Sequence, residues 1–265
     1  MPYVSTTAGR VFYRERGAGP PIVLLHAALH DHTDFDLIAE PLSADHKVIA
    51  VDWPGHGESD PAPARLSARL FADVLAEVVR GLPPAVFIGN SVGGYAAAKL
   101  AIDRPDQVSG LVLVNAGGFI AQNIVTRACC RLLGVKAVNH LVMPRMVPSY
   151  MKVRTDFDRA IARRVVDKAK TAEGARIDAA LWKSFATVDF DLRPAAARLT
   201  APTLLVWGER DPVIPLSAGR TTHQSLAGSQ LETLDTGHVV FASEPDRFLS
   251  LVRPFIETVS GKARA

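Results

Sequence analysis

The chain of 265 residues is long enough for one large domain, or for a core domain that carries an insertion. Hydrophobic residues make up 48% of it and its net charge is only +3, which allows a sizeable core and argues against a nucleic-acid-binding protein. It contains no signal-peptide pattern and no apolar stretch of about 18 residues that would span a membrane. Adjacent cysteines pair poorly, so Cys129 and Cys130 are expected as free thiols of a cytoplasmic protein.

Short apolar runs are separated by longer stretches with helical periodicity. Strands are expected at residues 10–17, 21–26, 46–52, 85–88, 111–116, 203–209 and 230–235, and helices at 32–43, 66–80, 91–103, 215–226 and 244–258. This alternation predicts an α/β fold, in which helices cover both faces of a mostly parallel central sheet.

The long segment between the strands at 111–116 and 203–209 has helical character and no strong strand pattern. It is too long for an ordinary connection between the layers of an α/β fold. We therefore expect a core formed by residues 1–116 and 200–265, and a helical cap at residues 117–199 that lies over one edge of the sheet.

The sequence VFIGNSVGG at residues 86–94 places Ser91 between glycines. It follows one predicted strand and begins a predicted helix, which is the context of a G-x-S-x-G nucleophile elbow. Such a turn lifts the serine above the sheet, where the free N–H groups and positive dipole of the helix N-terminus face the reacting oxygen. The alternative is a serine that only caps the helix.

A serine nucleophile needs a base, and the base needs an orienting acid. Asp211 follows the predicted strand at 203–209, and His238 follows the last strand. Both therefore belong at the carboxyl edge of the sheet, together with Ser91. The alternatives are a surface role for His238, a capping role for Asp211, or Glu209 as the acid.

The chain order Ser, Asp, His and five sequence segments resemble the α/β-hydrolase family. The segments are HAALH (26–30), VDWPGHGES (51–59), GNSVGG (89–94), GERDPVIP (208–215) and TGHVVFASEPDRF (236–248). The resemblance covers the whole chain except the insertion, which matches only as a helical cap.

This resemblance implies that Ser91 is the nucleophile, His238 the base and Asp211 its orienting acid. It also implies an oxyanion hole formed by the backbone N–H groups of Val92 and Ala28, and acyl transfer to water without a cofactor. The family usually has glycine where this chain has Ala27, and alanine would be strained there if the backbone were left-handed.

The substrate we expect is a carboxylic ester of a largely apolar molecule. The open alternatives are a C–C bond hydrolase of a vinylogous diketone acid, a lactonase, a thioesterase, and a ligand receptor on a hydrolase fold. Asn90 resembles the C–C hydrolase branch, but Val239 stands where that branch has tryptophan. Asn90, Val239 and Met143 are our candidate substrate contacts, and Arg176 is a guess for a side chain that would hold an acid group.

The HDH sequence at residues 30–32 resembles a pair of metal ligands. No further cluster of His, Asp or Glu at ligand spacing supports a metal site, and we expect no metal.

The predicted cap contains an unusually basic stretch. Between Phe119 and Thr155 there is no Asp or Glu, and the basic residues are Arg127, Arg131, Lys136, Arg145, Lys152 and Arg154. The stretch is either the solvated face of helices that cover an apolar pocket, or a surface that transiently contacts anionic lipid or admits an acidic substrate. The expected partner is a small apolar or amphipathic substrate and no nucleic acid, whereas the oligomeric state is left open.

Overall fold

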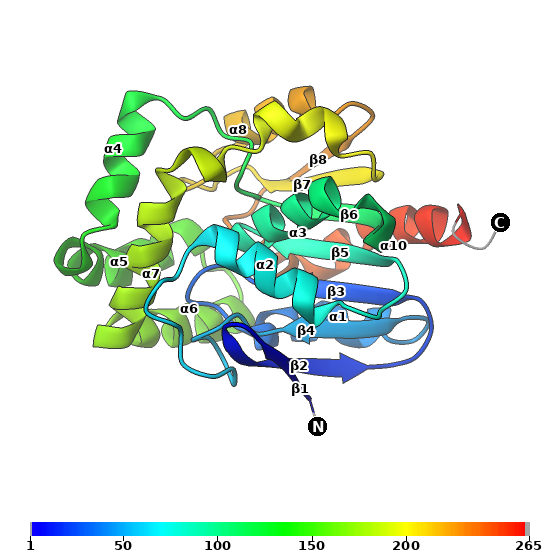
Figure 1. Cartoon of the computed structure of the whole chain (residues 1–265), viewed down its shortest axis with the longest axis horizontal. Helices are drawn as coiled ribbons and strands as arrows, with labels where there is room; N and C mark the ends of the chain where they lie inside the picture. The colour runs from blue at the N-terminus through cyan, green and yellow to red at the C-terminus, as the bar shows by residue number, and fades with distance from the viewer. Residues whose placement is uncertain (1, 263–265) are drawn as a thin grey trace.

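The computed structural model describes residues 2–262, and within this range eight strands form one sheet (Figure 1). Their order across the sheet is β1-β2-β4-β3-β5-β6-β7-β8. The strands are β1 (Tyr3–Thr6), β2 (Gly9–Arg16), β3 (Pro21–Leu25), β4 (Lys47–Val51), β5 (Ala85–Asn90), β6 (Val108–Val114), β7 (Thr203–Gly208) and β8 (Gln230–Leu234).

The strands from β4 to β8 in the sheet order run parallel, while β1 and β2 are antiparallel to their neighbours. The predicted α/β fold with a mostly parallel sheet is therefore confirmed. One strand is additional to those predicted, because the N-terminal segment forms a hairpin in which β1 pairs with β2. Gly9 stands where that hairpin turns, at a φ of 104° that suits glycine.

Helices cover both faces of the sheet, as the alternation of side chains in each buried strand requires. Ile22 and Leu24 of β3 pack in the cluster with α1, α9 and α10, whereas Val23 and Leu25 pack in the cluster with α2, α3 and α8. These helices are α1 (Asp36–Leu42), α2 (Ala68–Val78), α3 (Val92–Asp103), α8 (Leu216–Ser225), α9 (Val240–Ser243) and α10 (Pro245–Lys262). The helix predicted at 32–43 begins instead as a 3₁₀ turn over His32–Phe35.

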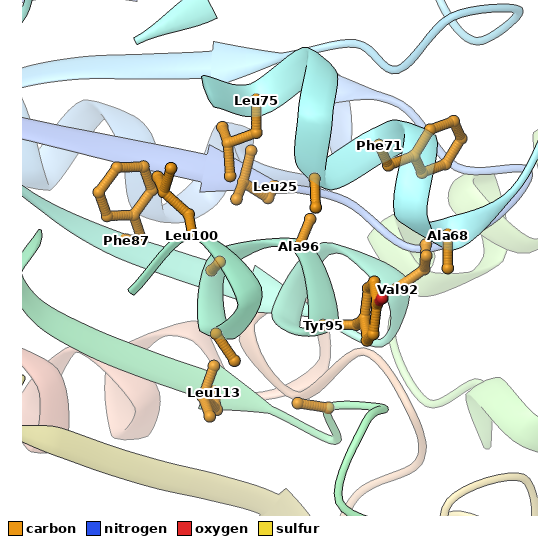
Figure 2. Packing of buried hydrophobic residues seen from close by; sticks show 14 of the residues in the cluster. Leu25, Ala68, Phe71, Leu75, Phe87, Val92, Tyr95, Ala96, Leu100 and Leu113 are labelled. Carbon is orange, nitrogen blue, oxygen red and sulfur yellow. The ribbon is translucent and has the colours of Figure 1, made fainter. Parts of the chain in front are cut away.

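The alanine-rich helix α3 packs against α2 and against strands β5 and β6 of the sheet. Figure 2 shows Val92, Ala96 and Leu100 of this helix among apolar side chains of α2 and of the strands. The small side chains let α3 approach both neighbours closely, and most residues of the helix are therefore buried. The N-terminus of α3, which directly follows Ser91, is thereby held in a fixed position.

The segment between β6 and β7 contains four helices, α4 (Ile124–Leu133), α5 (Lys136–Met151), α6 (Asp156–Ala169) and α7 (Ala172–Phe185). In Figure 1 they gather to the left of the sheet, beyond the strand ends. Short 3₁₀ turns at Val188–Phe190 and Arg193–Arg198 then lead back to β7. The four helices form the part of the chain for which we predict a cap, and we use that name for them below.

Candidate active site

Ser91 stands on a sharp turn between β5 and α3, with φ 56° and ψ −116°. The glycines around it are required by close backbone contacts. A Cβ at Gly93 would lie 2.3 Å from the carbonyl oxygen of Leu25, and one at Gly89 would lie 2.6 Å from the carbonyl oxygen of Gly93. The turn thus has the geometry of the nucleophile elbow that the motif predicts.

Asp211 and His238 come from the ends of two adjacent strands, β7 and β8, and both are buried. Asp211 Oδ2 lies 2.6 Å from His238 Nδ1. Because the carboxylate can only accept, this bond places the ring proton on Nδ1 and leaves Nε2 free to accept a proton. The other oxygen, Oδ1, accepts a bond of 2.8 Å from the backbone N–H of Val213, so the orientation of the carboxylate is fixed.

Asn115 is a site residue that our sequence analysis missed. Its Nδ2 donates to Asp211 Oδ2 at 2.7 Å, and its Oδ1 accepts from the backbone N–H of Gly208 at 2.8 Å. It has a left-handed backbone with φ 39°, a conformation that asparagine tolerates better than most residues. The available signal was a polar residue directly after the apolar strand β6, at the carboxyl edge of the sheet.

Ser91, His238, Val92 and Ala28 line one pocket. As the first residue of α3, Val92 has a backbone N–H that the helix leaves without an internal partner. Val92 and Ala28 thus line the same pocket as Ser91, and their role as oxyanion donors stays a prediction.

The loop that carries Ala28 is left-handed at Leu29, with φ 68°, and not at Ala27. The strain considered for alanine at position 27 therefore does not arise. The backbone N–H of Leu29 donates to His56 Nε2 at 3.0 Å. Burial lowers the pKa of His56 well below its usual value, which keeps this ring neutral and able to accept that bond.

Of the three candidate substrate contacts, only Met143 lines the pocket. Asn90 and Val239 lie behind it in the core, and their assignment as substrate contacts is corrected here. The side chain of Asn90 donates to the backbone carbonyls of Val114 and His238, each at 3.0 Å. Through its Nδ2 group, Asn90 therefore positions the backbone of His238.

The pocket encloses about 800 Å³, part of it open to solvent. Its cap wall comes from α4, α5 and α7 and from the segments beside them, and is mostly apolar: Ile120, Met143, Trp182, Phe185 and Phe190. Cys130 also faces it, and burial raises the pKa of this thiol to about 11. Among residues 2–262, no lysine or arginine lines this pocket.

The basic residues of the cap point elsewhere. Arg154 pairs with Asp235 at 3.0 Å, and Arg145 donates to the carbonyl of Leu141 in its own helix. Arg176, the guess for an acid-binding side chain, pairs with Glu173 at 2.6 Å and bonds the backbone of the loop after β4. Within the described range, no helix is long and apolar enough to cross a bilayer.

The side chains of the HDH segment form hydrogen bonds and ion pairs with other protein residues. His30 Nδ1 bonds Asp34, and His30 Nε2 lies 3.1 Å from the hydroxyl of Tyr150. Asp31 pairs with Arg164 at 2.6 Å, and His32 Nδ1 bonds Asp52 at 2.8 Å. In the part of the chain that the structure describes, no group of three or more His, Cys, Asp or Glu side chains is placed to hold a metal ion.

Tyr150 connects this network to the candidate base. Its backbone carbonyl accepts a bond of 2.9 Å from the N–H of His238, and its ring lies edge-on to the imidazole at 5.4 Å. A residue of the cap therefore holds a residue of the core in position.

Comparison with known proteins supports this architecture. The chain is 29% identical to a pimeloyl-[acyl-carrier protein] methyl ester esterase of Neisseria meningitidis serogroup C, over 93% of this chain and 98% of the relative. It is 27% identical to a 2-hydroxy-6-oxononadienedioate/2-hydroxy-6-oxononatrienedioate hydrolase of Klebsiella pneumoniae, over 93% and 91% of the two chains. Among solved structures, an esterase from Thermogutta terrifontis has the same fold, with a TM-score of 0.83, 23% identity, and coverage of 97% and 98%.

A model of the alpha/beta hydrolase family matches residues 22–251, which is most of the chain and includes every residue of the candidate site. The strand order, the elbow at Ser91 and this match agree, and the protein is a member of the alpha/beta hydrolase family.

Proposed function

We propose that the protein is a serine hydrolase that cleaves a carboxylic ester of a largely apolar substrate through an acyl-enzyme. The observation that carries the proposal is one pocket lined by Ser91 on its strained turn and by His238, whose Nδ1 is bonded to Asp211. These are the nucleophile, base and orienting acid of an acyl-transfer site.

In the proposed reaction His238 Nε2 takes the proton of Ser91 as the serine oxygen attacks the ester carbonyl. The N–H groups of Val92 and Ala28 stabilise the resulting oxyanion, and each such donor contributes about 3 kcal/mol to transition-state stabilisation. His238 then gives the proton to the departing alcohol. Water, deprotonated by His238, then attacks the acyl carbon, and the bond from that carbon to the Ser91 oxygen breaks. His238 returns the proton to Ser91 as the acid is released, so the proposed mechanism uses no cofactor.

The composition of the pocket favours an ester without a carboxylate group over a diketone acid. A substrate carboxylate would need a cationic partner in a largely dehydrated pocket, and no described lysine or arginine lines this one. The methyl ester esterase among the relatives supports ester cleavage. The C–C hydrolase among the relatives keeps that reaction as the second candidate.

The test is stopped-flow hydrolysis of p-nitrophenyl esters of increasing acyl length by wild type and Ser91→Ala. We expect a burst of nitrophenol from wild type and loss of at least about 10³-fold of kcat in the variant, with the unfolding transition unchanged. The preferred acyl length would show how long an acyl chain the pocket accommodates.

Near-normal turnover by Ser91→Ala would contradict the serine mechanism. Folded wild type that hydrolyses no ester would contradict ester cleavage, and a dienone acid would then test the C–C reaction. Tight ligand binding with very slow turnover would indicate a receptor instead.

A further inference from the structure

The pocket contains a buried carboxyl group that the proposed mechanism does not use. Asp178 on α7 lines the pocket and is 1% exposed. Its Oδ2 accepts a bond of 2.7 Å from Asn139 Nδ2, and the Trp182 indole is its other hydrogen-bond donor. Both donors are neutral, so the carboxylate has spare lone pairs and lacks a cationic partner among the described pocket residues.

Two residues that line the pocket, Thr126 and Tyr150, donate their hydroxyl protons to other protein groups. Thr126 Oγ1 donates to Asn123 Oδ1 at 2.7 Å. Tyr150 donates to His30 Nε2, because the bond between Asp34 and His30 Nδ1 makes Nε2 the acceptor. Neither hydroxyl group therefore has a proton left to donate to a substrate in the pocket.

The described polar side chains that line the cap wall thus offer mainly lone pairs. Gln122 adds a buried Oε1 without a protein partner to Asp178, Thr126 and Tyr150. A substrate that brings only ester oxygens and apolar groups to this wall would leave these acceptors unpaired, at a cost in binding free energy. A donor group on the substrate would satisfy them.

From this arrangement we infer that Asp178 is a specificity-determining residue, and that the natural ester carries a hydrogen-bond donor, a protonated amine in preference to a hydroxyl, which binds at Asp178. The inference rests on the proposed ester cleavage. A cation is preferred because it compensates a carboxylate that is otherwise buried beside neutral groups.

The carboxyl group must be ionised for this preference, and its environment sets where that happens. Burial raises the pKa of Asp178 to about 6, while its two hydrogen-bond donors oppose the rise. The other titratable groups lining the pocket are Cys130 on α4, Tyr150 on α5 and His238. Burial raises the pKa of both Cys130 and Tyr150, so neither ionises near neutral pH.

The experiment compares p-nitrophenyl esters of equal acyl length that end in a methyl, a hydroxyl, an ammonium or a carboxylate group, over a series of lengths. At pH 8 we expect kcat/KM at the best length to be at least about tenfold higher for the ammonium ester than for the methyl ester, which corresponds to one charge-assisted hydrogen bond. In Asp178→Asn this ratio should fall to one or below.

A second measurement uses wild type alone and does not depend on how the variant folds. The ratio of kcat/KM for the ammonium and methyl esters should fall as the pH is lowered through about 6, where Asp178 takes up a proton. Because both esters meet the same catalytic groups, pH effects on the chemical step cancel in the ratio.

A methyl ester preferred at every length, or a preference unaffected by Asp178→Asn and by pH, would overturn the inference and leave ester cleavage intact. A preferred carboxylate ester would overturn it too and would favour the diketone-acid alternative. Failure of the proposed function is seen separately, as a Ser91→Ala variant that still turns over a short acetyl ester.

Discussion

At the scale of single residues, the backbone of Ser91 is the most demanding feature of the site. A φ of 56° with ψ −116° is rare for a residue other than glycine, and such strain costs about 1–3 kcal/mol. Three backbone bonds of 3.1 Å hold it: Ser91 N–H donates to Val114, and its carbonyl accepts from Tyr95 and Gly117. The strain presents the hydroxyl group to the pocket.

Asn115 provides a test of how Asp211 is held. Asn115→Gly keeps a residue that tolerates φ 39° but removes the donor to Asp211 Oδ2. A hydrogen bond to a charged group contributes about 1.5–3 kcal/mol, so we expect kcat to fall about tenfold or more, with KM little changed. Steady-state kinetics with a short ester measures both.

The matched control is Thr222→Val, which removes a buried hydrogen bond to the carbonyl of Ala218 in α8, away from the pocket. It should lower the free energy of unfolding and leave kcat unchanged. If Asn115→Gly behaved in the same way, the side chain would be structural only.

At the scale of elements, helix α4 is unusual because it is apolar on two sides. Thr126 and Cys130 face the pocket, while Ile124, Val125 and Leu132 are exposed by 88%, 70% and 58%. In Figure 1 this helix stands at the outer edge of the cap. An exposed apolar face flanked by basic side chains, in a stretch without Asp or Glu, favours contact with an anionic lipid surface, which we propose for α4.

Vesicle sedimentation tests this surface. We expect binding to vesicles containing phosphatidylglycerol to weaken in Ile124→Ser with Leu132→Ser, and in Arg127→Glu with Arg131→Glu. Turnover of a short soluble ester should persist in both, because these four side chains do not line the pocket. Leu37→Ser, which changes an exposed leucine on α1, is the control.

Unchanged vesicle binding in both double variants would refute the lipid surface. If wild type instead self-associates through this face, the serine variants should become more monomeric in sedimentation velocity. Loss of short-ester turnover in the glutamate variant would indicate that the arginines act inside the pocket.

At the scale of the whole molecule, the cap is joined to the core by half-buried polar contacts. Arg164 of α6 pairs with Asp31 at 2.6 Å and also with Asp34, both in the loop after β3. Lys168 Nζ donates to the carbonyl of Gly55 at 2.8 Å. Burial lowers the pKa of Lys168 to about 8, although Asp31 and Asp52 partly offset this.

The Arg164 pairs predict an acid-sensitive part of the stability. Burial by itself would raise the pKa of Asp31, but Arg164 and the bonds from Thr33 outweigh it and lower the pKa to about 2. A depressed folded-state pKa stabilises the protein above the unfolded-state value of about 4, and this contribution is lost as the pH falls towards 2. Arg164→Met should therefore lower the free energy of unfolding at pH 7 by roughly 1–2 kcal/mol.

Urea unfolding from pH 7 down to pH 3 measures this contribution, and the difference from wild type should narrow over the acid range. Arg159→Met is the control on the same helix, because Arg159 pairs with the fully exposed Asp156 and should matter little. An Arg164→Met variant as stable as Arg159→Met at pH 7 would show that the ion pairs of Arg164 with Asp31 and Asp34 do not hold the cap.

The sheet, its covering helices and the placement of Ser91, Asp211 and His238 after strands were predictable from the amino-acid sequence. These follow from local patterns, because apolar periodicity reports which faces are buried, and a polar residue directly after a buried strand lies at the carboxyl edge of a parallel sheet. Asn115 also directly follows a buried strand, so the same rule would have predicted it at the carboxyl edge of the sheet.

The groups that the pocket presents to a substrate depend on how the cap helices pack. Its wall combines α4, α5 and α7, and their packing brings Asp178 to the pocket. Arg154 and Arg176 of the cap, which the sequence allowed equally well as pocket residues, instead form ion pairs outside it. Asn90 and Val239 were misassigned for a similar reason, since adjacency to Ser91 or His238 in the chain does not show which side of the turn a side chain occupies. Such long-range packing has no periodic signature in the sequence, so the chemistry of the pocket could be read only from the folded chain.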